Sequence, residues 1–182
     1  MITKDHIRQT AEVYLQENPQ EADALAPLFE LLEQDAELTS RKEFRGHVTA
    51  GAILTDREGR VLFIRHVALG RWLTPGGHLE AEDERLSDSA LRELTEETGI
   101  QAHHVVPLLD VPVHIDVHPI PASEAKGEPE HRHIDFRYLF TTDQDVVELQ
   151  TEEVSGAQWR EVETLGDAGM RERVRQVLQV RA

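Results

Sequence analysis

Residues 76–100 read GGHLEAEDERLSDSALRELTEETGI, and this stretch decides how the rest of the sequence is interpreted. Its apolar residues recur at helical spacing over residues 84–98, which predicts a helix there. Glu93, Glu96 and Glu97 stand at positions i, i+3 and i+4 of that helix, so their carboxylates share one face. Like charges in this arrangement destabilise a helix unless a cation neutralises them, and hard divalent cations prefer oxygen ligands. The stretch therefore predicts a metal-binding helix, with a solvated acidic helix as the alternative.

The second half of this stretch, RELTEETGI at residues 92–100, follows a recognisable order: Arg, Glu, an aliphatic residue, any residue, Glu, Glu, any residue, Gly and an aliphatic residue. In this it resembles the Nudix box, and Gly77 stands where the box opens with a glycine. The flanking strand pattern extends the resemblance over about residues 44–165. The resemblance implies the Nudix fold, an α+β fold in which a mixed β-sheet is sandwiched between helices. It also implies a hydrolase that cleaves a nucleoside diphosphate linked to another moiety.

The resemblance further implies a site for Mg²⁺ or Mn²⁺ at the acidic helix. The metal would neutralise the diphosphate and activate a water molecule for attack on phosphorus. The metal ligands that it implies are the carbonyl group of Gly77 and the carboxylates of Glu93, Glu96 and Glu97. The catalytic residues that it implies are Glu93, Glu97, Glu96, Arg92 and Glu84. Family members often use a further glutamate from outside the box, and the candidates here are Glu152 and Glu153.

The box is one residue longer here than in the family pattern. Counting forward from Gly77 places the first glutamate position on Asp83. Counting back from Arg92 places it on Glu84. We favour Glu84, because the helix fixes its register relative to Arg92. Asp83 suits the N-cap position, where a short carboxylate accepts hydrogen bonds from free backbone N–H groups.

Two segments downstream of the box alternate polar and apolar residues, as strands with one polar face do. The first lies within a strand expected over residues 104–118, and the second within one expected over 131–141. If these strands pair, their polar rows face each other beside the acidic helix and could line a substrate pocket. Arg65 ends an earlier strand and could hold a phosphate group. The substrate-binding residues expected are Arg65, His114, Asp116, His118, His131, His133, Asp135 and Arg137. A second metal site and a merely solvated strand face are the alternatives.

The chain as a whole is expected to divide into an N-terminal helical extension, residues 1–40, and a Nudix hydrolase domain, residues 41–182. Residues 1 to about 38 carry two apolar stripes at helical spacing. These stripes must cover either the Nudix core or a second subunit of a homodimer. Further expected elements are strands at 47–55, 61–66 and 157–162 and a helix at 171–180. The first two of these strands are expected to form a hairpin.

The composition narrows the classes of function. The 182 residues hold 19 Lys and Arg against 35 Asp and Glu, and the net charge of −16 opposes general binding to nucleic acid or to an anionic membrane. The absence of cysteine excludes disulfides and a thiolate nucleophile. No apolar run approaches the ~18 residues of a membrane span, and the first residues lack the apolar core of a secretory signal. We therefore expect a cytoplasmic enzyme whose partner is a small-molecule diphosphate.

Three other functions fit parts of the sequence. A non-hydrolytic Nudix-type sensor would bind a nucleotide or ADP-ribose, but a sensor can lose the acids that are complete here at Glu93, Glu96 and Glu97. An isomerase of prenyl diphosphates typically uses a cysteine acid, and the chain has none. A purely structural acidic protein would not require a glycine-framed box. The hydrolase is therefore the leading hypothesis.

Overall fold

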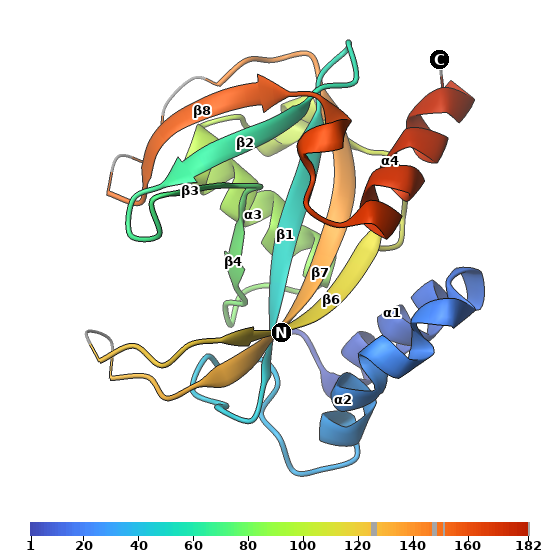
Figure 1. Ribbon diagram of the computed structural model, residues 1–182, viewed down its shortest axis with the longest axis vertical. Coiled ribbons are helices and arrows are strands. Elements are labelled where there is room, and N and C mark those ends of the chain that lie inside the picture. Colours follow the sequence, from blue (N-terminus) through green and yellow to red (C-terminus); the bar gives the residue numbers. More distant parts are fainter. Residues whose placement is uncertain (125–126, 147–148, 151, 182) are drawn as a thin grey trace.

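The computed structural model describes residues 1–124, 127–146, 149–150 and 152–181 (Figure 1). Its α-helices are α1 (Lys4–Glu17), α2 (Ala22–Leu32), α3 (Leu86–Thr98) and α4 (Ala168–Arg181). Its strands are β1 (His47–Thr55), β2 (Val61–His66), β3 (Arg71–Leu73), β4 (Gly76–His78), β5 (Val105–Pro107), β6 (His114–Ile120), β7 (His131–Thr142) and β8 (Val154–Arg160). Short 3₁₀ helices lie at Pro19–Glu21, Ala102–His104 and Val162–Thr164. No helix among the described residues has the length and apolar content needed to cross a membrane.

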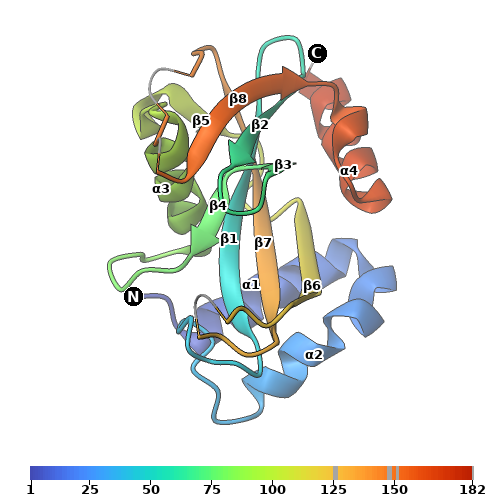
Figure 2. The same cartoon turned by 60° about the vertical axis from the view of Figure 1, so that its left-hand side comes forward.

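The strands form one mixed sheet around β1 and β7, which run parallel to each other along the whole of β1. β4 pairs antiparallel with β1, and β5 and β6 pair antiparallel with β7. β2 pairs with β1 at Thr55 and Val61, as the predicted hairpin requires, and most of its length pairs with β8. Figure 2 shows α3 and α4 on opposite sides of this sheet, so the predicted mixed sheet between helices is confirmed.

The two faces of the central strands pack against different helices. β1 is buried along its whole length, as expected for a strand of small and aliphatic residues whose two faces are both covered. Val48, Ala50, Ala52 and Leu54 pack into a core cluster shared with α1, α2 and α3. Ile53 points the other way, into a second core cluster that includes residues of α4. The face on which a side chain lies therefore follows from its odd or even position along β1.

The N-terminal helices pack against the sheet of the same chain. Ile7 and Tyr14 of α1 and Leu25 and Leu28 of α2 are almost completely buried in the core cluster that also holds Ile115 of β6. The apolar stripes predicted for this segment therefore exist, and the surface that they cover is the sheet. α2 ends earlier than the predicted boundary near residue 38.

The strand predicted over residues 104–118 divides into β5 and β6. The N–H group of Leu108 donates to the carbonyl group of Leu139 at 2.9 Å. The N–H group of Val113 donates to the carbonyl group of Arg137, two residues back along β7, at 2.7 Å. The residues between Leu108 and Val113 therefore loop out of the sheet. Pro112, in this loop, has no N–H group and could not donate a hydrogen bond to a neighbouring strand.

Candidate active site

α3 is held on the sheet by an apolar face and ends at a glycine. Leu86, Ala90 and Leu94 are fully buried in the core cluster shared with β1. Gly99 has a left-handed φ of 71°, and its N–H group donates to the carbonyl group of Thr95 at 2.9 Å, as is typical of a glycine that ends a helix. These contacts fix the rotation of the helix, which determines where its carboxylates lie.

Two carboxylates of α3, the half-buried Glu93 and the buried Glu97, lie against the backbone of β4. Glu97 is 3% exposed, and its Oε2 accepts a hydrogen bond from the N–H group of Gly76 at 3.0 Å. A Cβ atom placed on Gly77 would stand 2.6 Å from Oε1 of Glu93, so only glycine fits beside this carboxylate as it lies here. The structure thus brings together three of the four predicted ligand residues, Gly77, Glu93 and Glu97.

Arg92 ties α3 to the loop that precedes it. Its Nη1 donates to Glu93 at 3.0 Å and to the more exposed Glu96 at 3.1 Å. Its Nη2 donates to the carbonyl group of His78 at 2.8 Å, and its Nε and Nη2 reach the two carboxylate oxygens of Asp83, both at 3.2 Å. One guanidinium therefore positions two of the predicted metal ligands and the end of β4.

The extra residue of the box lies in the loop before α3, and the contacts there correct the expected register. Asp83 is buried, pairs with Arg92, and accepts the N–H group of Glu80 at 2.8 Å. Glu84, which the count from the helix favoured for the position next to Arg92, is exposed. The N-cap position predicted for Asp83 belongs to Arg85. The helix begins later than predicted, so Asp83 and Glu84 both lie in the loop and the helical register does not apply to either.

Removal from solvent disfavours the ionised forms of Glu93 and Glu97. It raises the pKa of Glu97 to about 8, and the negative charges of Glu93 and Glu153 add to the rise. It also raises the pKa of Glu93 to about 7, against the attraction of Arg92. Because Glu96 and Glu153 raise the pKa values of both groups, we call Glu93, Glu96, Glu97 and Glu153 the acidic cluster. Carboxylates whose ionisation is suppressed in this way are typical of functional sites, and a bound cation would relieve the repulsion.

We expect the affinity of the acidic cluster for a divalent metal to rise with pH between about 6 and about 8. Glu93 and Glu97 hold protons up to pKa values of about 7 and about 8, and a metal ion must displace these protons. Calorimetric titration with Mn²⁺ in buffers of different ionisation enthalpy would measure the affinity and the protons released. Binding that releases no protons at pH 6 to 7 would contradict this prediction.

The sign of the matching stability effect follows from the same pKa values. An acid whose folded-state pKa is raised binds more protons in the folded state than in the unfolded state. The metal-free protein should therefore lose stability as pH rises from the ordinary glutamate value of 4.5 towards about 8. Saturating metal should remove this loss.

Arg65 and Glu153 lie at neighbouring positions on the sheet. The N–H group of Val67, just beyond β2, donates to the carbonyl group of Glu153 at 2.7 Å. The hydroxyl group of Ser155 donates to the carbonyl group of Arg65 at 3.2 Å, and the side chain of Arg65 is exposed near the end of β2 as predicted. Glu152 and Glu153 are both exposed, and Glu153 is the one whose charge acts on the acidic cluster.

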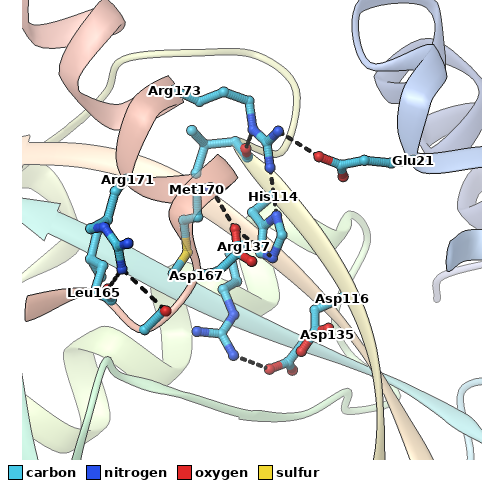
Figure 3. Close-up of polar contacts among 12 residues, drawn as sticks. Glu21, His114, Asp116, Asp135, Arg137, Leu165, Asp167, Met170, Arg171 and Arg173 are labelled. Carbon is cyan, nitrogen blue, oxygen red and sulfur yellow. Dashed lines mark hydrogen bonds and ion pairs between the residues drawn. The ribbon is translucent and has the colours of Figure 1, made fainter.

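β6 and β7 pair in antiparallel register, so the two polar rows lie side by side as predicted. Asp116 pairs with Asp135, and His118 pairs with His133. Asp116 is hydrogen-bonded to Nδ1 of His118 at 2.9 Å, and this contact lowers the pKa of Asp116 and raises that of His118. Asp135 accepts a hydrogen bond from Nη2 of Arg137 at 2.7 Å (Figure 3). The carboxylates of the rows are therefore paired with cationic or ionisable neighbours.

His114, at the end of one row, is enclosed by α4. Nη2 of Arg173 donates to its Nδ1 at 2.6 Å, and Asp167 lies 3.9 Å from its Nε2 (Figure 3). Arg173 also donates to Glu21 at 2.6 Å. Burial lowers the pKa of His114, which suits a neutral acceptor. The structure thus places this predicted substrate residue at a junction between α4, β6 and the N-terminal segment.

The polar rows lie on the sheet face opposite α3, which corrects the prediction that they flank the acidic helix. Ile115 and Ile134 alternate with the polar residues and pack into the core cluster shared with α3. Alternation directs the polar side chains to the other face. β4 connects the two regions: Gly77 faces Glu93, and His78, the next residue, lies against the polar rows.

Sequence reasoning missed three residues that join the polar rows from other strands. His47 and Thr49 of β1 stand in register with His133 and Asp135, and the hydroxyl group of Thr49 donates to Asp135. His78 of β4 pairs with Thr49. The available signal was the alternation of His47 and Thr49 with apolar residues at the start of a run that otherwise reads as wholly buried.

Comparison with known proteins identifies the same family over most of the chain. The family model of the NUDIX domain matches residues 45–180. A protein of Lactococcus lactis subsp. cremoris (strain MG1363), named "Probable DHNTP pyrophosphohydrolase", is 36% identical over 153 residues, which cover 81% of this chain and 84% of that protein. Phosphatase NudJ of Escherichia coli (strain K12) is 46% identical over 61 residues, 32% of this chain and 39% of that protein.

Two solved structures share the fold at low sequence identity. The Ap4A hydrolase of C. elegans, in a binary complex, superposes with a TM-score of 0.53 at 19% identity and covers 73% of this chain and 96% of its own. The dihydroneopterin triphosphate pyrophosphohydrolase of E. coli superposes with a TM-score of 0.54 at 15% identity and covers 72% and 95%. The family match and the relative at 36% identity agree with the acidic helix and its glycines. The chain therefore belongs to the Nudix family of diphosphate hydrolases.

Proposed function

We propose that this enzyme hydrolyses a diphosphate bond in a nucleotide-like triphosphate, with dihydroneopterin triphosphate as the first candidate substrate. The observation that supports hydrolysis is the position of the half-buried Glu93 and the buried Glu97 against the backbone of Gly76 and Gly77. The pterin is suggested by the name of the Lactococcus relative, which aligns with 81% of this chain.

The acidic cluster fits Mg²⁺ or Mn²⁺, and we propose Glu93, Glu96, Glu97 and the carbonyl group of Gly77 as ligands. All of these donors are oxygen atoms, which hard divalent cations prefer. The charges of the half-buried Glu93 and the buried Glu97 repel each other, so a cation would relieve an unfavourable interaction. When bound, the ion supplies charge neutralisation for the diphosphate and lowers the pKa of a water molecule.

The protein groups around the cluster have separate proposed roles in the reaction. A water oxygen bonds to phosphorus, and the bridging P–O bond breaks with its electron pair on the departing phosphate. Glu153 is the proposed acceptor of the water proton, because it is exposed and its charge acts on the cluster. Arg92 holds Glu93 and Glu96 in place. Arg65, exposed near the end of β2, is proposed to bind a phosphate group through two parallel hydrogen bonds from its guanidinium.

The polar rows are the proposed binding surface for the heterocycle. A pterin presents an N–H group and an adjacent amino group, and one carboxylate can accept both hydrogen bonds. The side chain of Asp116 is 40% exposed, whereas that of Asp135 is 19% exposed and already paired with Arg137. Asp116 is therefore the proposed acceptor, and its hydrogen bond with His118 orients it.

A substrate panel tests the proposal. Dihydroneopterin triphosphate, GTP, Ap4A and ADP-ribose would each be supplied with Mg²⁺ or Mn²⁺, and the phosphorylated products separated by anion exchange. We expect kcat/KM for the pterin triphosphate to exceed that for Ap4A and ADP-ribose by at least about tenfold, since a site that hydrogen-bonds one ring rejects others. Asp116→Asn should reduce this preference, whereas Asp110→Asn, at an exposed position outside the rows, should not.

The panel separates failure of the substrate choice from failure of the chemistry. Equal rates on all four compounds would show that the pterin assignment is wrong while hydrolysis stands. No phosphorylated product from any of the four with either metal would overturn the proposed hydrolysis of these substrates.

A further inference from the structure

Three histidines from three neighbouring strands converge at one end of the polar face. His47 lies on β1, His78 on β4 and His133 on β7, with β1 in the middle. Their ring centroids are 5.2 Å (His47–His78), 4.7 Å (His47–His133) and 5.3 Å (His78–His133) apart, which is nearly an equilateral triangle. One ring nitrogen of each histidine lies within 4.8 Å of those of the other two. We call these residues the histidine triangle.

The protonation of His47 leaves a lone pair aimed into the protein interior. His47 is 1% exposed, and its Nδ1 lies 3.2 Å from the carbonyl group of Glu43. A carbonyl oxygen only accepts, so Nδ1 carries the proton and Nε2 is the bare nitrogen. Nε2 of His47 is buried and has no hydrogen-bond partner among the described residues. Buried polar atoms are nearly always satisfied, so an unpartnered one needs a ligand to explain it.

The surroundings of the triangle repeat this arrangement. Nδ1 of His131 lies 2.8 Å from the carbonyl group of Pro129, and its ring stacks on His47 at a centroid distance of 5.1 Å. Nδ1 of His118 is bonded to Asp116, and its ring lies 5.9 Å from that of His133. A second-shell acceptor on one ring nitrogen is the usual partner of a metal-binding histidine, because it fixes the tautomer and the ring orientation.

We propose that His47, His78 and His133 bind a transition-metal dication, with Zn²⁺ as the representative ion, at a site distinct from the acidic cluster. Imidazole ligands favour Zn²⁺, Cu²⁺ or Ni²⁺, whereas Mg²⁺ prefers carboxylate and water. Zn–N bonds of about 2.0–2.1 Å in tetrahedral geometry separate the nitrogens by about 3.4 Å, so the rings need to close by roughly an ångström. His118, His131 or a water molecule can take the fourth position.

The distribution of protons and charges favours a metal ion at the histidine triangle over an anionic group of the substrate. Arg137 lies in the same polar rows, and its Nη2 donates to Asp135 at 2.7 Å, so its positive charge is partly neutralised there. The buried Nε2 of His47, unpartnered among the described residues, carries a lone pair and no proton, because Nδ1 donates to the carbonyl group of Glu43. A lone pair in this position has little attraction for a phosphate group and can bind a cation.

The site would join β4 to the centre of the sheet. β4 is a short strand, and its last residue is His78, whose carbonyl group accepts from Arg92 of the box. A metal bound to His47, His78 and His133 would therefore fix the position of β4, which carries Gly76 and Gly77 beside the acidic cluster. This role is structural and does not require the metal to contact substrate.

Zinc binding with and without the triangle tests the proposal. Full-length wild type, His78→Ala and His133→Ala would be titrated with Zn²⁺ in excess Mg²⁺, and Co²⁺ would be used to record the visible spectrum. Wild type should retain one equivalent of Zn²⁺ and show the intense bands of four-coordinate Co²⁺. Either substitution should weaken binding by more than about 100-fold, since loss of a second-shell partner alone costs about 10- to 100-fold. His103→Ala, an exposed histidine outside the triangle, is the matched control and should bind as wild type does.

A fourth variant separates this site from the acidic cluster. Glu97→Gln should retain Zn²⁺ and the Co²⁺ spectrum, whatever happens to its activity. If zinc is lost in Glu97→Gln but kept in His78→Ala and His133→Ala, the ion binds the acidic cluster and the proposal is wrong. Failure of wild type to retain zinc would also overturn it. The far-ultraviolet circular dichroism of each metal-free variant should match that of wild type, which excludes unfolding as the cause of a loss.

Discussion

Glu97→Gln is expected to lower kcat by about 10²- to 10³-fold in saturating Mg²⁺, in line with the loss of one electrostatic group at a metal-dependent site. The substitution keeps the shape of the side chain and can keep an oxygen acceptor for the N–H group of Gly76, now 3.0 Å from Oε2. It removes a buried carboxyl group whose pKa is raised to about 8, so that its ionisation is unfavourable in the folded, metal-free protein. The metal-free variant should therefore be at least as stable as wild type, which thermal unfolding followed by circular dichroism would show.

Asp88→Asn is the matched control for this experiment. Asp88 lies in the first turn of α3 and is paired with Arg85 at 3.3 Å, so its substitution changes one charge on the same helix outside the cluster. Its activity should remain close to that of wild type. Full activity of Glu97→Gln, or activity of wild type in excess chelator, would contradict the metal-dependent mechanism proposed here.

Gly77→Ala is expected to disable the metal site while leaving the sheet folded. The new Cβ atom would stand 2.6–2.7 Å from the carboxylate of Glu93, and the carboxylate must move because it is the free end of a long side chain. Metal affinity should fall by at least about tenfold, and activity at limiting Mn²⁺ should fall with it, because metal sites tolerate only small displacements of their ligands. Titration with Mn²⁺, followed by its electron paramagnetic resonance signal, would measure the affinity.

The second glycine variant, Gly166→Ala, controls for the conformational effect of replacing a glycine. A Cβ atom on Gly166 would have no neighbour within 4 Å, so this change should leave metal affinity and activity unaltered. If Gly77→Ala bound Mn²⁺ as wild type does, the prediction would be wrong, because the close contact with Glu93 would then not affect metal binding.

The sequence predicts the local elements well because their signals lie within a few residues. The bounds expected for β1 and β2, 47–55 and 61–66, are those observed. The helix of the box ends at Gly99 because a left-handed residue there terminates it, and that signal is local. β8 and α4 occupy the regions expected at 157–162 and 171–180 with shifted ends, which is where propensity is least informative.

The features that the sequence did not predict depend on contacts between segments that are distant in the sequence. The contact of Asp83 with Arg92 depends on the path of a loop, and no periodicity describes a loop. The strand expected at 104–118 is divided because β5 and β6 both pair with β7, each along a different part of it. The histidine triangle needs β1, β4 and β7 side by side, and a pattern within one strand cannot show that arrangement.

The parallel pairing of β1 with β7 also governs how the chain can fold as it is made. Thr49 and Asp135, which meet in this pairing, are 86 residues apart in the sequence. During synthesis β1 emerges from the ribosome long before its partner exists, and at about 5–20 residues per second it waits for several seconds. Through that interval its nine-residue, largely apolar segment is unpaired along one edge. Folding dominated by such distant contacts is slow, so the nascent chain depends on β2, β4 and α3, which follow soon after β1, to cover this strand until β7 arrives.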